Sequence, residues 1–215
     1  MTSEDSRIFQ FKISLKCIKP KIWRRIQVPS SYNFLQLHYA IQDSMGWKSR
    51  FTDYHLHVFR RRFGPFGRSG CIEIGKPIDT SSNFMGFWDR VEIVPEEVAK
   101  IDEYFGCVKT KYVYLYDFGD DWEHEIVLEK VLPAVEGYTY PKCISGKRAC
   151  PPEDCGGYDG YDDHLKIVRN SKHPEHKKHL EWVKSQDAKL DPEEFDPKAV
   201  KFYEGNPNKG RESNL

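Results

Sequence analysis

The residues best suited to chemistry are concentrated in YDFGDDWEHEI, residues 116–126. Three aspartates, a tryptophan and a histidine surround one glycine there, and carboxylate and imidazole groups serve as general acids and bases and as metal ligands. Two further histidines form a His-x-His pair in HLHVF. On a strand their Cα atoms would lie about 7 Å apart on one face, which suits two ligands of one metal ion. The candidate functional cluster is therefore His55, His57, Asp117, Asp120, Asp121, Trp122 and His124.

The elements that carry this cluster favour a structural hairpin over a catalytic site. In a strand at residues 121–129, the tryptophan and histidine are in phase with aliphatic residues and belong to the core face, whereas the glutamates belong to the solvent face. The aspartates fall at the turn, where Gly119 is expected to supply a positive φ and the carboxylates to bond nearby amides. The expected core-face residues are Trp122, His124, Ile126 and Leu128.

A second candidate site lies in CISGKRACPPEDC, residues 143–155, which holds three of the six cysteines. In a chain expected to occupy a reducing compartment, such a cluster favours zinc over a disulfide. The cysteines do not form a C-x-x-C pair and two prolines interrupt them, so the spacing is less specific than that of a standard zinc motif. The expected zinc ligands are Cys143, Cys150 and Cys155, with His124 or His164 as the fourth.

Arginines interleaved with aromatic residues in residues 59–68 suggest contacts with nucleic-acid bases and phosphates. Residues 1–70 hold 13 Lys and Arg against 4 Asp and Glu, yet the whole chain has a net charge of zero. A neutral protein lacks the general attraction on which most nucleic-acid binders depend, so the uneven charge favours attraction between parts of one fold. A protein partner is therefore favoured over nucleic acid. The alternative nucleic-acid-binding residues are Arg60, Arg61, Arg62 and Arg68.

Strand patterns separated by turns, with helical patterns between and after them, predict an α+β fold with a mainly antiparallel sheet built from hairpins. Helices are expected to pack on the sheet, followed by a helical C-terminal segment. We expect one domain at 1–170, a helical C-terminal extension packed on it at 171–205 and a disordered tail at 206–215. The expected strands are residues 8–18, 21–28, 54–59, 71–75, 91–94, 111–117 and 121–132, the expected helices residues 34–45 and 95–105, and residues 139–160 are expected to form a long loop.

The chain has none of the sequence features of a membrane or secreted protein. No stretch approaches the roughly 20 apolar residues of a membrane span. The first ten residues, MTSEDSRIFQ, are polar and carry acids, unlike the basic and then apolar order of a signal peptide. We therefore expect a cytoplasmic protein with no membrane partner.

Five motifs in order resemble the Ri-plasmid open-reading-frame-three family, also called plasmid pRiA4b ORF-3-like. They are KPKIWRRIQVP, LHYAIQDSMGW, YHLHVF, YDFGDDWEHEI and YPKCISGKRACPPEDCGGYDGY, and the resemblance runs from about residue 7 to about residue 170. The resemblance implies an α+β domain but no established activity. Some members are labelled resolvase-like passenger proteins of insertion elements, and this chain has no recombinase catalytic set. The family pattern covers Trp23, Arg24, Gly46, Trp47, His55, His57, Asp117 to Asp121, Trp122, His124 and Pro151 to Gly157.

Three functions follow as hypotheses. The first is a non-enzymatic α+β module that binds a macromolecular partner through the surface around its two hairpins and has a structural zinc ion in the 143–155 loop. The second is a metal-dependent hydrolase acting on a phosphoester, in which His55, His57, His124 and Asp120 or Asp121 hold an ion that activates water. The third is a nucleic-acid-associated protein of mobile-element origin.

Overall fold

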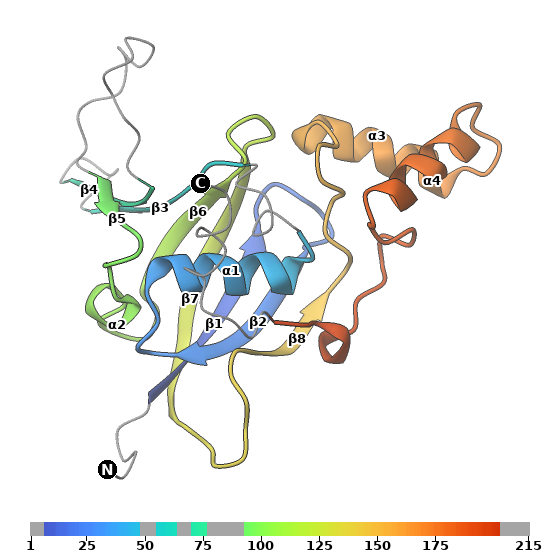
Figure 1. Cartoon of the computed structure of the whole chain (residues 1–215). Coiled ribbons are helices and arrows are strands. Elements are labelled where there is room, and N and C mark those ends of the chain that lie inside the picture. The colour runs from blue at the N-terminus through green and yellow to red at the C-terminus, as the bar shows by residue number, and fades with distance from the viewer. Residues whose placement is uncertain (1–6, 48–54, 64–69, 77–92, 203–215) are drawn as a thin grey trace, which may run out of the picture.

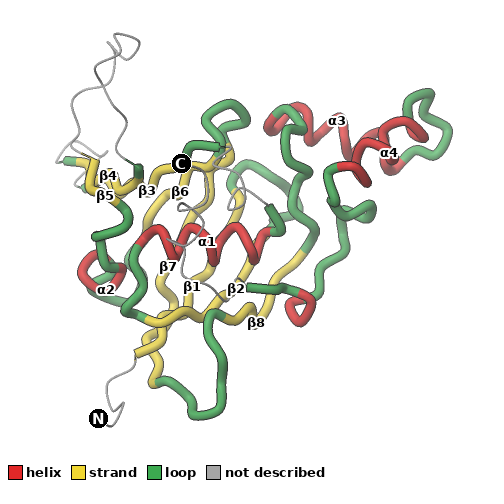
Figure 2. Tube along the Cα trace, in the orientation of Figure 1, coloured by secondary structure: helices red, strands yellow, loops and turns green. Residues whose placement is uncertain are grey.

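A single eight-stranded sheet, antiparallel except at one edge, organises the computed structural model, which describes residues 7–47, 55–63, 70–76 and 93–202 (Figures 1 and 2). The strand order is β5-β4-β3-β6-β7-β1-β2-β8, and only β4 and β5 are parallel. The α+β class and the two expected hairpins, β1–β2 and β6–β7, are confirmed. The strands are β1 Arg7–Leu15, β2 Trp23–Pro29, β3 His57–Arg62, β4 Cys71–Gly75, β5 Ile93–Pro95, β6 Lys111–Tyr116, β7 Trp122–Pro133 and β8 Lys142–Lys147.

Helix α1, Phe34–Met45, lies across one face of this sheet (Figure 1). The side chain of Asn33 accepts a hydrogen bond from the Gln36 amide, and the Gln36 side chain accepts one from the Asn33 amide, so two of the free amides at the helix start are satisfied. Gly46 ends the helix in the left-handed conformation, φ 103°. The helix therefore begins and ends where its sequence predicts, and its apolar side closes the core.

Three expected elements differ from the structure. Strand β3 begins at His57, so His55 precedes the strand and alternation does not place the two rings on one face. The expected helix at 95–105 is reduced to α2, Ile101–Tyr104, because residues 93–95 instead pair with β4. The loop expected at 139–160 contains edge strand β8, which pairs with β2. The glycine and proline content of this segment had indicated a loop and not a strand.

The C-terminal part consists of a helix pair and an extended strap. Helices α3, Gly157–Arg169, and α4, His176–Ser185, pack on one another beside the sheet (Figure 1). The chain then returns to the sheet, where the Phe195 ring lies 3.7 Å from the buried Arg24 guanidinium. Within the described residues 171–202, the expected helical character is thus limited to α4 and the short 3-10 turn Pro197–Ala199. Residues 203–205 and the expected 206–215 tail lie outside the described residues. In the part of the chain that is described, no helix has the length and apolar character needed to cross a membrane.

Candidate functional site

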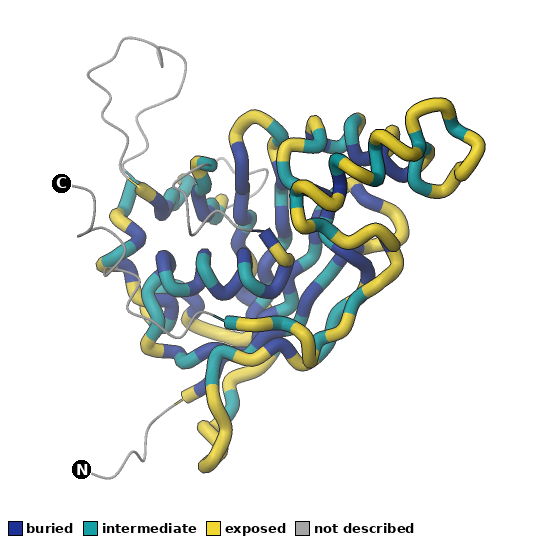
Figure 3. Tube along the Cα trace, turned by 45° about the vertical axis from the view of Figure 1, so that its right-hand side comes forward, coloured by how far each residue is buried: buried dark blue, intermediate teal, exposed yellow. Residues whose placement is uncertain are grey.

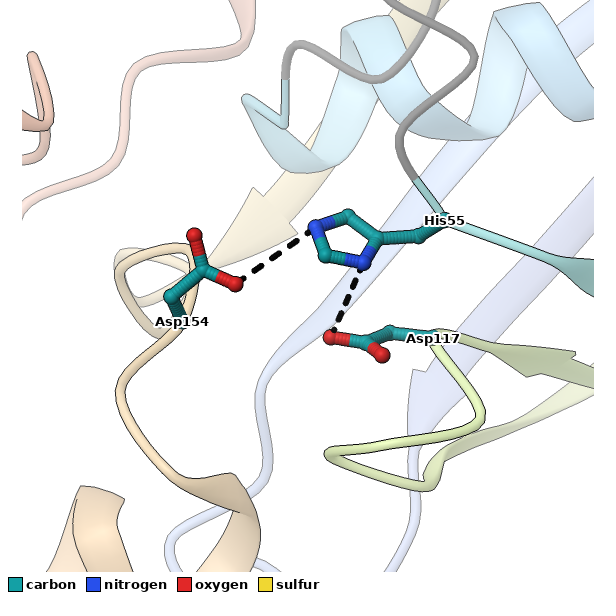
Figure 4. Close-up of side chains that lie close together, drawn as sticks. All are labelled: His55, Asp117 and Asp154. Atoms are coloured by element: carbon teal, nitrogen blue, oxygen red, sulfur yellow. Dashed lines mark ion pairs between the residues drawn. The ribbon is translucent and has the colours of Figure 1, made fainter.

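Three side chains from distant parts of the sequence meet at the end of the sheet where β6 turns into β7. His55 lies with Nδ1 at 3.3 Å from Oδ2 of Asp117 and with Nε2 at 3.6 Å from Oδ1 of Asp154 (Figure 4). One potential ligand atom from each residue lies within 4.8 Å of the other two. Among the described residues, this is the one group in which three or more His, Cys, Asp or Glu side chains converge in this way. The imidazole thus lies between two carboxylates, each facing a different ring nitrogen.

Asp117 is held rigidly by the turn that follows β6. Its amide donates to the Leu56 carbonyl at 2.9 Å, and its Oδ1 accepts from the Gly119 amide at 2.9 Å, which directs Oδ2 toward His55. The expectation that Gly119 supplies the positive φ of this turn is wrong. Asp117 and Asp121 adopt it, at 56° and 60°, because short aspartate side chains that bond local amides tolerate this conformation.

Asp154 reaches the same place from the loop between β8 and α3. Its side chain is 64% exposed, in contrast to the nearly buried carboxyl group of Asp117. The adjacent Glu153 accepts a hydrogen bond from the Tyr116 hydroxyl at 3.0 Å, which joins this loop to the end of β6. Asp154 was not among the predicted ligands, although it lies within the 151–157 motif of the family resemblance. No local spacing links it to His55.

Gly160 fixes the path of the Asp154 loop. A Cβ atom at this position would lie 1.8 Å from the Cys155 carbonyl oxygen, so the backbone can pass here only without a side chain. We expect Gly160→Ala to lower the free energy of unfolding by roughly 1–3 kcal/mol and to displace Asp154 from His55. Urea unfolding would measure the first effect. An unchanged stability would show that the loop adapts without strain.

His57 takes no part in this group, which corrects the expected pairing with His55. Its Nε2 lies 2.6 Å from Oε2 of the buried Glu96, and its ring stacks on His38 with centroids 3.6 Å apart. His38 Nδ1 in turn lies 2.7 Å from the Tyr114 hydroxyl, which also accepts from Gln42 Nε2 at 2.8 Å. Burial lowers the pKa of His38 well below its usual value. These contacts form a polar network that joins α1 to β3 and β6. No sequence motif includes Glu96, so it was not among the predicted site residues.

His124 and Trp122 belong to the core, as alternation predicts. Nδ1 of His124 donates to the Trp122 carbonyl at 3.1 Å, while its Nε2 is buried and has no hydrogen-bond partner among the described residues. Burial lowers the pKa of His124 to about 4, so the ring is neutral at pH 7. A metal site shared by His55, His57 and His124 is therefore not formed. Asp120 and Asp121 lie in the turn outside the group around His55.

The cysteine loop does not form a zinc site in the described conformation, since neither its three cysteines nor His124 belong to a group of converging ligands there. Burial raises the pKa of Cys155 to about 12 and that of Cys150 well above its usual value. Without a metal ion both are therefore thiols at neutral pH, and zinc binding would release their protons. Zinc binding by Cys143, Cys150 and Cys155 stays a prediction that requires this loop to rearrange.

The arginines of β3 are largely engaged within the fold. Arg60 Nε donates to Glu73 at 2.7 Å, and Arg61 donates to the Tyr104 carbonyl at 3.2 Å. Arg62 is exposed, and Arg68 lies outside the described residues. Nucleic-acid binding by these residues stays a prediction, with Arg62 as the described member most accessible to a phosphate.

Comparisons with known proteins agree with the sequence motifs and with the fold. The model of the family described as plasmid pRiA4b ORF-3-like protein matches residues 7–199. The uncharacterized protein y4hQ of Sinorhizobium fredii is 33% identical over 180 residues, which span 84% of this chain and 82% of that protein. The crystal structure of the protein of unknown function MM3350 from Methanosarcina mazei Go1 is similar with a TM-score of 0.74 and 41% identity, over 92% of this chain and 99% of that one. These names state no activity, so function has to be inferred from the site.

Proposed function

The chain belongs to the plasmid pRiA4b ORF-3-like family, and we propose that it is a binding module whose functional centre is a divalent metal ion held by His55 and Asp154. The observation that carries this proposal is the position of the His55 ring between Asp117 and Asp154 (Figure 4). In a metal-bound histidine, one ring nitrogen usually donates a hydrogen bond to a carboxylate or similar acceptor and the other nitrogen binds the ion.

Each of the three residues has its own part in the proposed site. Asp117 is nearly buried and anchored by the turn, so it orients the His55 ring and favours the tautomer with the proton on Nδ1. The Nε2 lone pair then faces Asp154, whose exposed carboxylate can move to meet an ion. One imidazole and one or two carboxylates form a mixed nitrogen and oxygen set, which suits Zn²⁺ or Mn²⁺ better than the purely oxygen-preferring Ca²⁺.

The surroundings of the site support binding of a macromolecular partner there. Leu56 follows His55, Phe118 follows Asp117, and both apolar side chains are exposed. A protein that contacts this end of the sheet could bury them and supply a further ligand to the ion. This is the surface around the two hairpins that the sequence pattern favours for partner binding.

Metal binding is tested by elemental analysis of protein purified without added metal, followed by calorimetric titration of chelator-treated protein with Zn²⁺ and Mn²⁺. We expect one ion per chain, binding at least about a hundredfold weaker in His55→Asn, and binding about tenfold to a hundredfold weaker in Asp117→Asn. Asp162→Asn, which changes an exposed carboxylate of α3 outside the group, is the matched control.

Two results would contradict the proposal. The first is the absence of binding in the unmodified protein. The second is binding that survives in His55→Asn and disappears in Cys150→Ser, which would assign the ion to the cysteine loop instead.

The exposure of Asp154 also favours a second candidate function, metal-dependent hydrolysis. A metal ion held by few protein ligands keeps coordination positions for water and lowers the pKa of that water, which then attacks a phosphoester. Hydrolysis of bis-p-nitrophenyl phosphate that needs added metal and is lost in His55→Asn would support this function. A metal-loaded protein with no such activity would leave the binding module as the function.

A further inference from the structure

The face of the sheet turned away from α1 has a hollow that the proposed metal site does not use. No described helix lies across this face (Figure 1). Half-buried residues alternate with buried ones along β2 and the first part of β7, and the half-buried set belongs to this face (Figure 3). The hollow has a volume of about 620 Å³ and lies over β1, β2 and β7, with β8 and the segment before β6 at its sides. We infer that it binds an acidic polypeptide segment by taking up one of that segment's apolar side chains.

Two β-bulges shape the hollow. The register between β1 and β7 shifts between Gln10 and Phe11, and the register between β2 and β8 shifts between Arg25 and Ile26. Gln10 and Arg25 both line the hollow. A bulge adds a residue to one strand and increases the local twist. The extra residues are Glu129 of β7 and Ile144 of β8, which both line the hollow, so the strands on either side of β1 and β2 are bent here. The hollow therefore lies where the register shifts on both sides of β1 and β2.

The floor of the hollow is polar and internally neutral. Arg25 donates from Nε and Nη2 to the two carboxylate oxygens of Glu129, at 2.6 and 2.9 Å, and Gln10 donates to the same carboxylate at 3.0 Å. These bonds lower the pKa of Glu129 and raise that of Arg25, so both groups stay charged and paired at neutral pH. Because Arg25 compensates its charge, Glu129 opposes an acidic ligand only weakly.

The walls and rim determine which ligand fits. Val108 is 43% exposed and Ile144 is 37% exposed, and together with Val127 they offer apolar walls to a side chain. Lys109 and Lys130 are exposed at the rim, and neither forms an ion pair with a described carboxylate. An aliphatic or aromatic side chain flanked by Asp or Glu would match both properties.

A polypeptide fits the hollow better than single-stranded nucleic acid does. Nucleic-acid platforms offer aromatic faces for base stacking, but the hollow itself is lined by aliphatic walls. The nearby Trp23 ring already has Lys12 at 5.3 Å and Arg25 at 5.2 Å from its centroid. The lysines would attract either polyanion, whereas the apolar walls favour an amino-acid side chain.

The inference is tested by selecting peptides from a random displayed library on the full-length protein. Before selection, peptides that bind the Ile144→Glu variant are removed from the library. We expect the selected peptides to be enriched in Asp and Glu next to Leu, Ile, Phe or Trp. Fluorescence anisotropy of a labelled selected peptide should show binding weakened about tenfold by Ile144→Glu and about threefold by Lys130→Glu. Lys178→Glu, on the exposed side of α4, is the matched charge control and should leave the affinity unchanged.

Lys130, Ile144 and Lys178 are all exposed, so the thermal unfolding midpoint of each variant should stay close to that of the unmodified protein. Selected peptides without an excess of acidic residues, or affinities insensitive to Ile144→Glu, would overturn the inference. So would tighter binding of single-stranded oligothymidylate than of any selected peptide, if that binding were lost in Ile144→Glu.

Discussion

Replacing Glu96 with alanine is expected to lower the free energy of unfolding by about 1–3 kcal/mol, the range for leaving a buried hydrogen-bonding group without its partner. Glu96 is 1% exposed, and its Oε2 lies 2.6 Å from Nε2 of His57. Without it, the His57 ring stays stacked on His38 beneath α1 but loses its carboxylate, and water cannot easily replace that contact. Urea unfolding at pH 7, followed by circular dichroism, measures the change.

The control is Glu103→Ala, which removes an exposed carboxylate from α2 and should change the stability by less than about 0.5 kcal/mol. The double variant His57→Leu/Glu96→Leu should recover part of the loss, because it leaves no unpaired polar group and keeps the volume. A loss below about 1 kcal/mol in Glu96→Ala would show that water or another side chain satisfies His57. The polar network would then not be what joins α1 to the sheet.

Local patterns in the sequence predicted the parts of the fold whose causes are local. The alternation around Trp122 and His124 determined which side of β7 is buried, and Asn33 and Gly46 determined the ends of α1. Strand β8 escaped prediction because its stability comes from pairing with β2, and its own residues combine glycine with weak alternation.

The candidate site could be predicted only in part, for a similar reason. His55 and Asp117 were selected by residue type, but their contact depends on a hydrogen bond between the Asp117 amide and the Leu56 carbonyl. Asp154 joins them because β8 and its loop return the chain to the end of β6. His57 was assigned to the same site because β3 was expected to begin earlier. Long-range pairing of this kind cannot be read from spacing within one segment.

Lowering the pH from 7 to 4.5 is expected to destabilise the protein through its buried histidines. Burial lowers the pKa of His124 from 6.5 to about 4, so between these values the unfolded chain binds a proton that the folded chain does not. Stability therefore falls as the pH drops through this range, and linkage gives a loss of about 2.5 kcal/mol at pH 4.5 from His124 alone. His38 and His164 should add to the loss, because burial lowers the pKa of both.

The contribution of His124 can be isolated with His124→Asn. The asparagine amide can take the place of Nδ1 and donate to the Trp122 carbonyl, but it does not titrate in this range. Urea unfolding at pH 7 and pH 4.5 should show a pH-dependent loss smaller by about 2.5 kcal/mol in this variant, whatever its stability at pH 7. His173→Asn, at a more accessible histidine between α3 and α4, should keep the full loss. An undiminished loss in His124→Asn would mean that the imidazolium finds a partner in the core, and the unpaired Nε2 would then be the position to examine for a buried water molecule.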